Sequence, residues 1–246
     1  MSNRIRGVLL DLGDTLVHLD KPWDEVYEAE VRSLASYLHD SGVKMDFQKF
    51  PPAFVRAFED ATAKASLYRI EIPMEEIIAK VLSKFGVRNV DPEFIHGAVE
   101  AYYRPEIQSW QLFPDTLDTL TALEKSRYLL GIVSNARSDW QVNSILRKFD
   151  LTRFFNLIVI SALLRIRKPR AEIFLKALDG LDLSPKETVF IGNSVDADVL
   201  GPKSVGIHTI HIQRQQPDHD LILGPEATVT SLTDALKTLH NWTKDD

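Results

Sequence analysis

The chain has 246 residues, of which 44% are hydrophobic and 26% charged, close to the averages of globular proteins and enough for one large domain or two smaller ones. A net charge of −6 argues against nucleic-acid binding, and the absence of cysteine excludes disulfides, zinc–thiolate sites and cysteine nucleophiles. The N-terminal residues lack the apolar core of a secretory signal, and no apolar run approaches the ~20 residues of a membrane span, so we expect a soluble, cytoplasmic protein without a membrane partner.

Short apolar runs that end at a small or acidic residue recur along the chain. They do not alternate with polar residues, which is typical of buried parallel strands. Amphipathic patterns at residues 115–125, 139–149 and 171–180 predict helices between the later runs. This alternation predicts an α/β fold with a doubly wound, Rossmann-like parallel sheet. The runs are Val8–Leu10, Leu129–Val133, Leu157–Ile160, Val189–Ile191 and Ile207–Ile212.

The stretch from about residue 22 to 108 contains no convincing strand. Four helical patterns fill it instead, with prolines near their starts, where proline is tolerated best. They lie at about residues 23–39, 48–66, 74–86 and 92–104. We therefore expect an all-helical cap domain, residues 17–110, inserted into a core made of residues 1–16 plus 111–246. Residues 16–21 and 110–114 are the expected crossings between them.

Polar residues follow the predicted strands at the edge where open α/β sheets bind their ligands. Asp11 ends the first run, and an aspartate placed there can act as a nucleophile that forms a covalent ester. Thr15 and Ser134 offer hydroxyl donors to an anionic oxygen, and Lys168 offers positive charge that keeps Asp11 ionised. Asn135 adds an amide donor for a substrate.

Four segments resemble the motifs of the haloacid dehalogenase (HAD) superfamily, in the order in which that family carries them. The segments are Asp11–Leu16, Ser134–Asn135, Lys168–Pro169 with Glu172–Phe174, and Gly192–Asp198 with Gly201–Lys203. The helical insertion looks like the C1-type cap of this superfamily. The resemblance covers nearly the whole chain and implies a hydrolase in which Asp11 is the nucleophile.

In the phosphatase branch the resemblance also implies Mg²⁺, bound by Asp11, the backbone carbonyl of Gly13 and Asn193, with Asp198 alongside. Two of these positions depart from the family pattern. Gly13 stands where the family has a general acid/base aspartate, and Asn193 stands where it has a carboxylate. Mg²⁺ usually sits on one or two carboxylates plus phosphate oxygens, so the predicted metal site is weakened.

Several further residues have two interpretations. Asp14 is a candidate substitute acid, but a role in a tight turn is favoured. Asp196 either approaches the metal or caps a helix at about 196–205, and the cap is favoured. His18 and Arg69 are candidate substrate contacts. Trp110 and Phe113 are expected to pack the hinge, residues 213–220 to form a loop, and residues 240–246 to fray.

These features favour a Mg²⁺-dependent phosphomonoester phosphatase that acts on a small anionic substrate. Without an acid at position 13, activated phosphates are the favoured substrates, because general acid help is worth ~10²–10⁴-fold. One alternative is a metal-independent 2-haloacid dehalogenase, since a halide leaves without a proton. Another is a non-catalytic protein that binds a phosphate ligand or a partner. The sequence leaves open whether the protein is a monomer or a homodimer.

Overall fold

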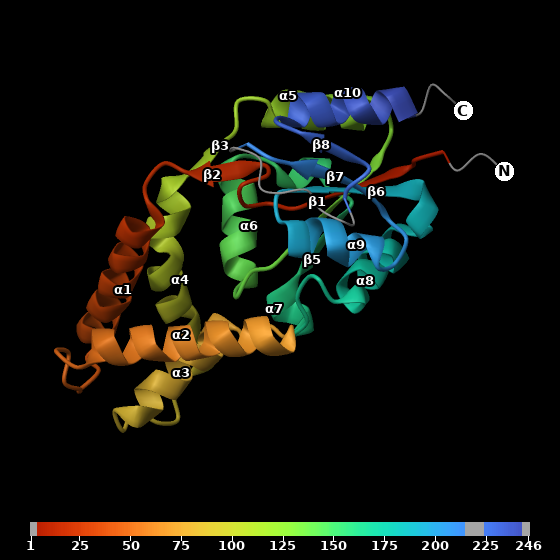
Figure 1. The fold of residues 1–246 in the computed structure, drawn as a ribbon. Coiled ribbons are helices and arrows are strands. Elements are labelled where there is room, and N and C mark those ends of the chain that lie inside the picture. The colour runs from red at the N-terminus through yellow and green to blue at the C-terminus, as the bar shows by residue number, and fades with distance from the viewer. Residues whose placement is uncertain (1–3, 215–223, 243–246) are drawn as a thin grey trace.

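The computed structural model describes residues 4–214 and 224–242, and within them six strands form one sheet (Figure 1). The strand order is β5-β4-β1-β6-β7-β8, and every neighbouring pair is parallel. The predicted Rossmann-like sheet is therefore confirmed, and β8 is an addition to it. The bounds are β1 Gly7–Leu10, β4 Leu129–Ser134, β5 Leu157–Ile160, β6 Thr188–Gly192, β7 His208–Ile212 and β8 Ala227–Val229.

Helices cover both faces of this sheet, because alternate side chains of each strand point to opposite faces. In β1, Val8 and Leu10 pack in one apolar cluster with α5 (Thr116–Lys125), α6 (Asp139–Lys148) and α10 (Leu232–Trp242). Leu9 packs in another with α8 (Ala171–Leu181). Figure 1 shows α5 and α10 above the sheet and α8 below it. The shorter turns are η1 Thr152–Phe154, α7 Ser161–Leu164, η2 Pro185–Glu187, the π-helical η3 Val195–Leu200 and α9 Gly201–Lys203.

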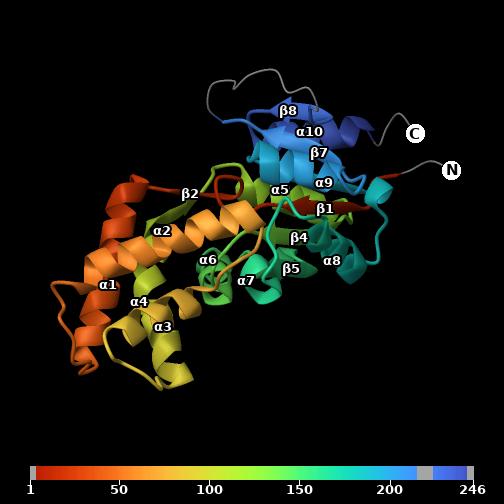
Figure 2. The same cartoon turned by 60° about the horizontal axis from the view of Figure 1, so that its bottom comes forward.

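The first four helices after β1 pack around an apolar core of their own, as the sequence predicts for the insertion (Figure 2). Proline stands in the first turn of α2 and α4 and directly before α3, where its missing N–H costs nothing. Helix α4 continues through Pro105, five residues beyond its predicted end. The helices are α1 Trp23–Asp40, α2 Phe50–Tyr68, α3 Met74–Lys84 and α4 Pro92–Ser109, and we call them the helical unit.

The two crossings into the helical unit are strands rather than plain loops. Strand β2 (Val17–Leu19) pairs antiparallel with β3 (Trp110–Leu112), within the predicted crossings 16–21 and 110–114, and this pairing is a feature that the sequence analysis does not predict. Each strand has only three residues, too few for an alternating pattern to show in the sequence. The predicted domain boundaries, at 16/17 and 110/111, fall at this ribbon, and they stay a prediction.

The end of the chain also departs from expectation. Residues 240–242 close α10 rather than fray, because Leu232, Ala235 and Leu239 bury one face of that helix. Residues 243–246 and most of the predicted loop, 215–220, lie outside the described part of the structure. None of the helices described is both long and apolar enough to cross a lipid bilayer.

Candidate active site

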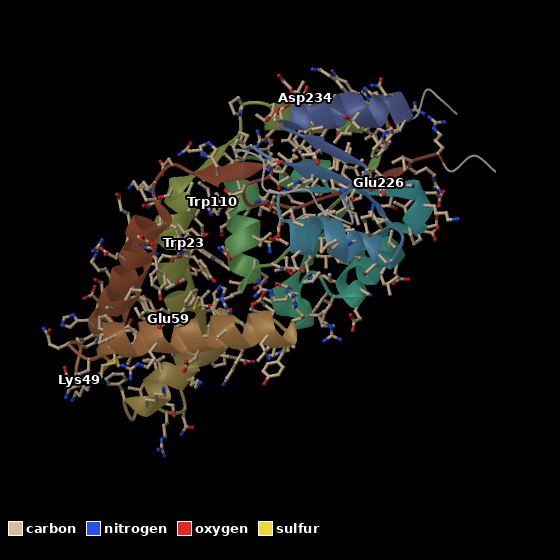
Figure 3. All side chains as sticks on the ribbon, viewed as in Figure 1. Trp23, Lys49, Glu59, Trp110, Glu226 and Asp234 are labelled. Carbon is tan, nitrogen blue, oxygen red and sulfur yellow. The ribbon has the colours of Figure 1, made fainter. Side chains whose placement is uncertain are left out.

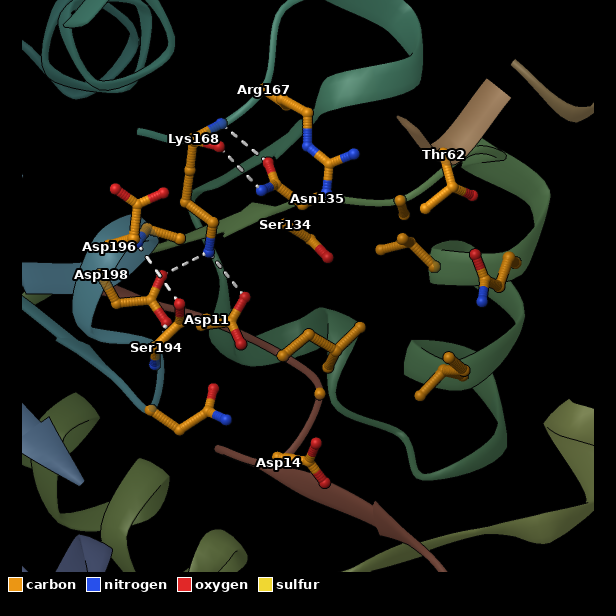
Figure 4. Close-up of a pocket in the computed structure, with 18 of the residues that line it drawn as sticks. Asp11, Asp14, Thr62, Ser134, Asn135, Arg167, Lys168, Ser194, Asp196 and Asp198 are labelled. Atoms are coloured by element: carbon orange, nitrogen blue, oxygen red, sulfur yellow. Dashed lines mark hydrogen bonds and ion pairs between the residues drawn. The ribbon is translucent and has the colours of Figure 1, made fainter. Parts of the chain in front are cut away.

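Four of the predicted site residues, Asp11, Ser134, Asn135 and Lys168, meet at one edge of the sheet (Figure 4). Strand β1 lies between β4 and β6, and all three run parallel, so their carboxyl ends are neighbours. Asp11 follows β1 and donates its backbone N–H to the Ile191 carbonyl at 3.0 Å. Ser134 ends β4 and Asn193 follows β6. The side chains of Asp11, Ser134 and Asn193 therefore border one space.

Lys168 connects two buried carboxylates in this space. Its Nζ lies 2.7 Å from Asp11 Oδ1 and 2.7 Å from Asp198 Oδ1. Burial raises the pKa of Asp11 to about 6, the Lys168 ammonium opposes that shift, and the Asp198 carboxylate adds to it. Burial disfavours the charged form of Lys168, but the two carboxylates outweigh burial and raise its pKa. Lys168 therefore stays charged, and the third of its N–H donors, which has no hydrogen-bond partner among the described residues, is available for a bound anion.

Asn135 holds the backbone of Lys168 in place. Its Oδ1 accepts from the Lys168 N–H at 2.8 Å, and its Nδ2 donates to the Lys168 carbonyl at 3.1 Å. The side chain borders the site, and one of the two N–H donors of its amide is engaged with this loop, so the role as a substrate donor stays a prediction that involves the other N–H. Asn135 is a positioning residue that fixes where the Lys168 ammonium lies.

The two predicted hydroxyl donors have different surroundings. Thr15 is fully buried, and its Oγ1 lies 3.5 Å from Asp11 Oδ2 and 3.4 Å from Asn193 Oδ1, two long contacts of which its one proton serves one at a time. It supports Asp11 from behind instead of facing a substrate. Ser134 borders the open space, and its hydroxyl has no hydrogen-bond partner among the described residues. Ser134 is thus the hydroxyl that is placed to contact a ligand.

The oxygen atoms around Asp11 are of the kind that Mg²⁺ prefers. Asp11 Oδ2, the Gly13 carbonyl and Asn193 Oδ1 are hard donors, and one of them is a carboxylate. Asp198 uses its oxygens otherwise, since Oδ1 binds Lys168 and Oδ2 accepts from the Ser194 N–H at 2.9 Å. No group of three His, Cys or carboxylate side chains suited to a metal occurs in the described ranges. The residues fit an ion that completes its shell with water and phosphate oxygens.

A cavity of about 560 Å³ extends from Asp11 to the helical unit. Arg69 borders this cavity as predicted, but its guanidinium binds Asp196 of η3 at 2.7 Å. Asp196 therefore pairs across the cavity, and the prediction that it caps the helix is wrong. Ser194 is the cap instead, since its Oγ accepts from the Ala197 N–H. From the helical unit, the lining includes Trp23, Thr62, Ser66, Arg69 and Glu106.

His18 lies outside this cavity. Its ring packs 4.7 Å from the Phe113 ring, and it lines a neighbouring hollow that shares Asp14 and Asn193 with the main cavity. Asp14 has a φ of 55° and donates its N–H to the Val17 carbonyl, which agrees with the favoured tight-turn interpretation. Burial raises the pKa of Asp14, and His18 opposes that shift. The structure does not bring His18 beside Asp11.

A family model described as "Haloacid dehalogenase-like hydrolase" matches residues 39–212, most of the chain. The chain belongs to this family. The match includes Ser134, Lys168 and Asn193, whereas Asp11 precedes it. The family assignment thus rests on residues 39–212, whereas the position of Asp11 at the sheet edge comes from the structure.

Relatives of this HAD-like hydrolase carry different names. A protein from Methanocaldococcus jannaschii, named glyceraldehyde 3-phosphate phosphatase, is 26% identical over 98% of this chain and 100% of its own. A Danio rerio protein, named haloacid dehalogenase-like hydrolase domain-containing protein 3, is 27% identical over 93% of each chain.

Solved structures show the same fold. A 2-haloacid dehalogenase from Pseudomonas syringae superposes with a TM-score of 0.70 at 20% identity, covering 97% of this chain and 99% of that chain. A HAD phosphatase from Thermococcus onnurineus gives 0.66 at 20% identity, covering 96% and 98%. At this level of identity the structural likeness extends to the fold alone.

The space beside Gly13 in this HAD-like fold is filled by Trp110, a feature that the sequence does not reveal. A Cβ atom at position 13 would lie 3.4 Å from the Trp110 ring, so a side chain there would be in contact with that ring. Figure 3 shows Trp110 and Trp23 at the junction of sheet and helical unit. Trp110 is buried, as predicted for a residue that packs the hinge, and its indole N–H donates to Glu106 at 3.2 Å.

Glu106 and Glu30 form a buried acidic pair beneath this tryptophan. Glu106 accepts hydrogen bonds from Trp110 and from Gln141 of α6, whereas the carboxylate oxygens of Glu30 have no hydrogen-bond partner in the described ranges. Burial raises the pKa of Glu106 to about 7, and burial together with Glu106 raises the pKa of Glu30 further above its usual range. The side chains beside the pair include the tyrosines Tyr27, Tyr102 and Tyr103, which carry no positive charge that would stabilise an ionised carboxylate.

We expect the variant Glu30→Gln to stabilise the protein more at high than at low pH. A carboxyl with a raised folded pKa keeps its proton on folding, so the folded state loses stability as pH rises from 4.5 through about 7. Removing one acid relieves this loss. The Tm difference between Glu30→Gln and wild type is expected to grow by about 3 °C or more between about pH 5 and about pH 9. The exposed Glu28→Gln on the same helix is the control, and a pH-independent difference would contradict the account.

Proposed function

We propose that the chain is a phosphomonoester hydrolase that works through an aspartyl-phosphate on Asp11. The observation that carries this proposal is the buried Lys168, which binds Asp11 and Asp198 at 2.7 Å each at the floor of a cavity. Relatives named as phosphatases, similar over nearly the whole chain, support it. The substrate is a small phosphate ester, and residues 17–110 act as the cap over it.

The proposed reaction has two displacement steps at phosphorus. A carboxylate oxygen of Asp11 forms a bond to phosphorus while the ester oxygen leaves with its electron pair and takes a proton from solvent. Lys168 and Ser134 hold the phosphoryl oxygens as their charge is redistributed. Water then attacks phosphorus, loses a proton to solvent, and releases inorganic phosphate and the Asp11 carboxylate. Since Gly13 has no proton to give, substrates with good leaving groups react best.

The proposed cofactor is Mg²⁺, held by Asp11, the Gly13 carbonyl and Asn193. When bound, it would neutralise charge on the phosphoryl oxygens. Asp198 is proposed to fix Lys168 instead of binding the ion directly, since both of its oxygens are engaged.

Hydrolysis of 4-nitrophenyl phosphate, a substrate with a good leaving group, tests this proposal. We expect phosphate release in the presence of Mg²⁺ and loss of most of it after chelation with EDTA. No release with Mg²⁺, together with metal-free chloride release from 2-chloropropionate, would reject the phosphatase in favour of a dehalogenase. Phosphate release that is unaffected by EDTA would contradict the proposed Mg²⁺ cofactor but agree with the proposed phosphatase activity.

A further inference from the structure

Arg167 is the cation of the cavity whose charge is least satisfied. Lys168 binds two carboxylates and Arg69 binds Asp196 at 2.7 Å. Arg167 borders the same cavity, a quarter of its side chain is exposed, and its nearest carboxylate, Glu71, lies 3.8 Å away. At that distance the two groups form a loose ion pair without a hydrogen bond, and the guanidinium makes no hydrogen bond to any described residue.

Other groups hold the carboxylate of Glu71 at its distance from Arg167. The Ser161 hydroxyl donates to Oε2 at 2.9 Å, and the Ile72 N–H and the Arg137 guanidinium lie 3.3 and 3.4 Å from Oε1. Burial lowers the pKa of Arg167, Glu71 opposes that shift, and the positive charges of Arg137 and Arg69 add to it. Arg167 thus shares the single carboxylate of Glu71 with Arg137.

In Figure 4, Arg167 and Lys168 extend to different parts of the cavity although they are neighbours in sequence. Lys168 turns toward Asp11, whereas Arg167 extends past Asn135 toward Thr62 of the helical unit. When the phosphoryl group of a substrate lies beside Asp11, the Arg167 guanidinium is therefore left to contact another part of that substrate. A partly buried guanidinium without a hydrogen-bonding partner is costly, and an anionic group supplies the bidentate partner it lacks.

We propose that Arg167 binds a second anionic group, a carboxylate or a second phosphoryl group, on the phosphomonoester substrate. This inference rests on the proposed phosphatase function and specifies its substrate class. Arg167 is then a specificity residue that contributes to binding at a distance from the reacting phosphorus.

The test compares substrates that differ only in this second group. Phosphoglycolate carries a carboxylate, ethane-1,2-diol bisphosphate carries a phosphoryl group, and 2-hydroxyethyl phosphate carries a neutral hydroxyl. We expect wild type to prefer one of the two substrates with an anionic second group over the hydroxyl compound by about tenfold or more in kcat/KM. The substrate that is preferred identifies the second group. Arg167→Gln should bring this ratio close to one, and Arg167→Lys, which keeps the charge but not the fork, should be intermediate.

Arg170→Gln is the matched control, because Arg170 lies on the same loop, pairs with Glu172 and does not line the cavity. It should keep the wild-type ratio. Equal kcat/KM values in wild type, or the same ratio in Arg167→Gln, would overturn the proposal. Turnover of 4-nitrophenyl phosphate is measured in parallel, so that a failure of the phosphatase proposal is seen separately. Even without turnover, the increase in Tm caused by each compound in wild type and in Arg167→Gln decides whether Arg167 binds the second anion.

Discussion

Replacing Asp11 with asparagine is expected to lower kcat for 4-nitrophenyl phosphate by about 10⁴-fold or more, as removal of a catalytic group does in well-studied hydrolases. The amide cannot form the ester with phosphorus, and nothing else at the cavity floor replaces it. Asp198 is committed to Lys168 and to the Ser194 N–H.

The same variant is expected to fold at least as stably as the wild type. The pKa of Asp11 is raised to about 6, mainly by burial, so its charged form is unfavourable in the folded protein above that pH. Asparagine removes this charge while Lys168 keeps Asp198 as its partner. Asp14→Asn is the control, because asparagine tolerates the left-handed conformation at φ 55° and should retain most of the activity. Activity in Asp11→Asn close to that of wild type would contradict the assignment of Asp11.

Replacing Lys168 with methionine is expected to affect both activity and stability. The ammonium is 3% exposed and lies between two carboxylates. Removing one partner of a buried ion pair typically costs about 3–5 kcal/mol, and here two carboxylates are left facing each other. Loss of the charge that holds the phosphoryl group should also reduce kcat by about 10²–10³-fold.

Two further variants separate these effects. Lys176→Met on α8 removes an exposed lysine 3.7 Å from Asp179 and should leave Tm and activity near wild type. The double variant Lys168→Met/Asp198→Asn removes one of the uncompensated charges and should recover part of the lost Tm without recovering activity. A single variant Lys168→Met with wild-type Tm would show that the ion pairs contribute little to the fold.

The sheet and the grouping of Asp11, Ser134 and Lys168 follow from the sequence, because they depend on local patterns. Apolar runs without alternation mark buried parallel strands, and the ends of such strands meet at one edge. Asp11, Ser134 and Asn193 each stand at the end of a predicted strand, and this position predicts that they meet in space. The four helices of the insertion are equally local, since their apolar faces and their prolines lie in sequence.

The remaining features depend on contacts between distant segments, which no single-sequence pattern encodes. Trp110 fills the space beside Gly13 only because β3 pairs with β2. Asp196 pairs with Arg69, 127 residues away. It is therefore an ion-pair partner, a role outside the two that the sequence suggests, helix cap and metal contact. Arg167 stays unsatisfied because Glu71 is held by Ser161 and Arg137, from two further segments.

The most direct test of the central claim is to stop the wild-type enzyme with acid during turnover of an activated aryl phosphate and to locate phosphate by peptide mass mapping. An acyl phosphate survives briefly in acid, so a covalent intermediate is open to detection. The account predicts a phosphorylated peptide that contains Asp11, absent from Asp11→Asn. A phosphoryl group on another side chain, or turnover with no phosphorylated peptide at any quench time, would contradict it.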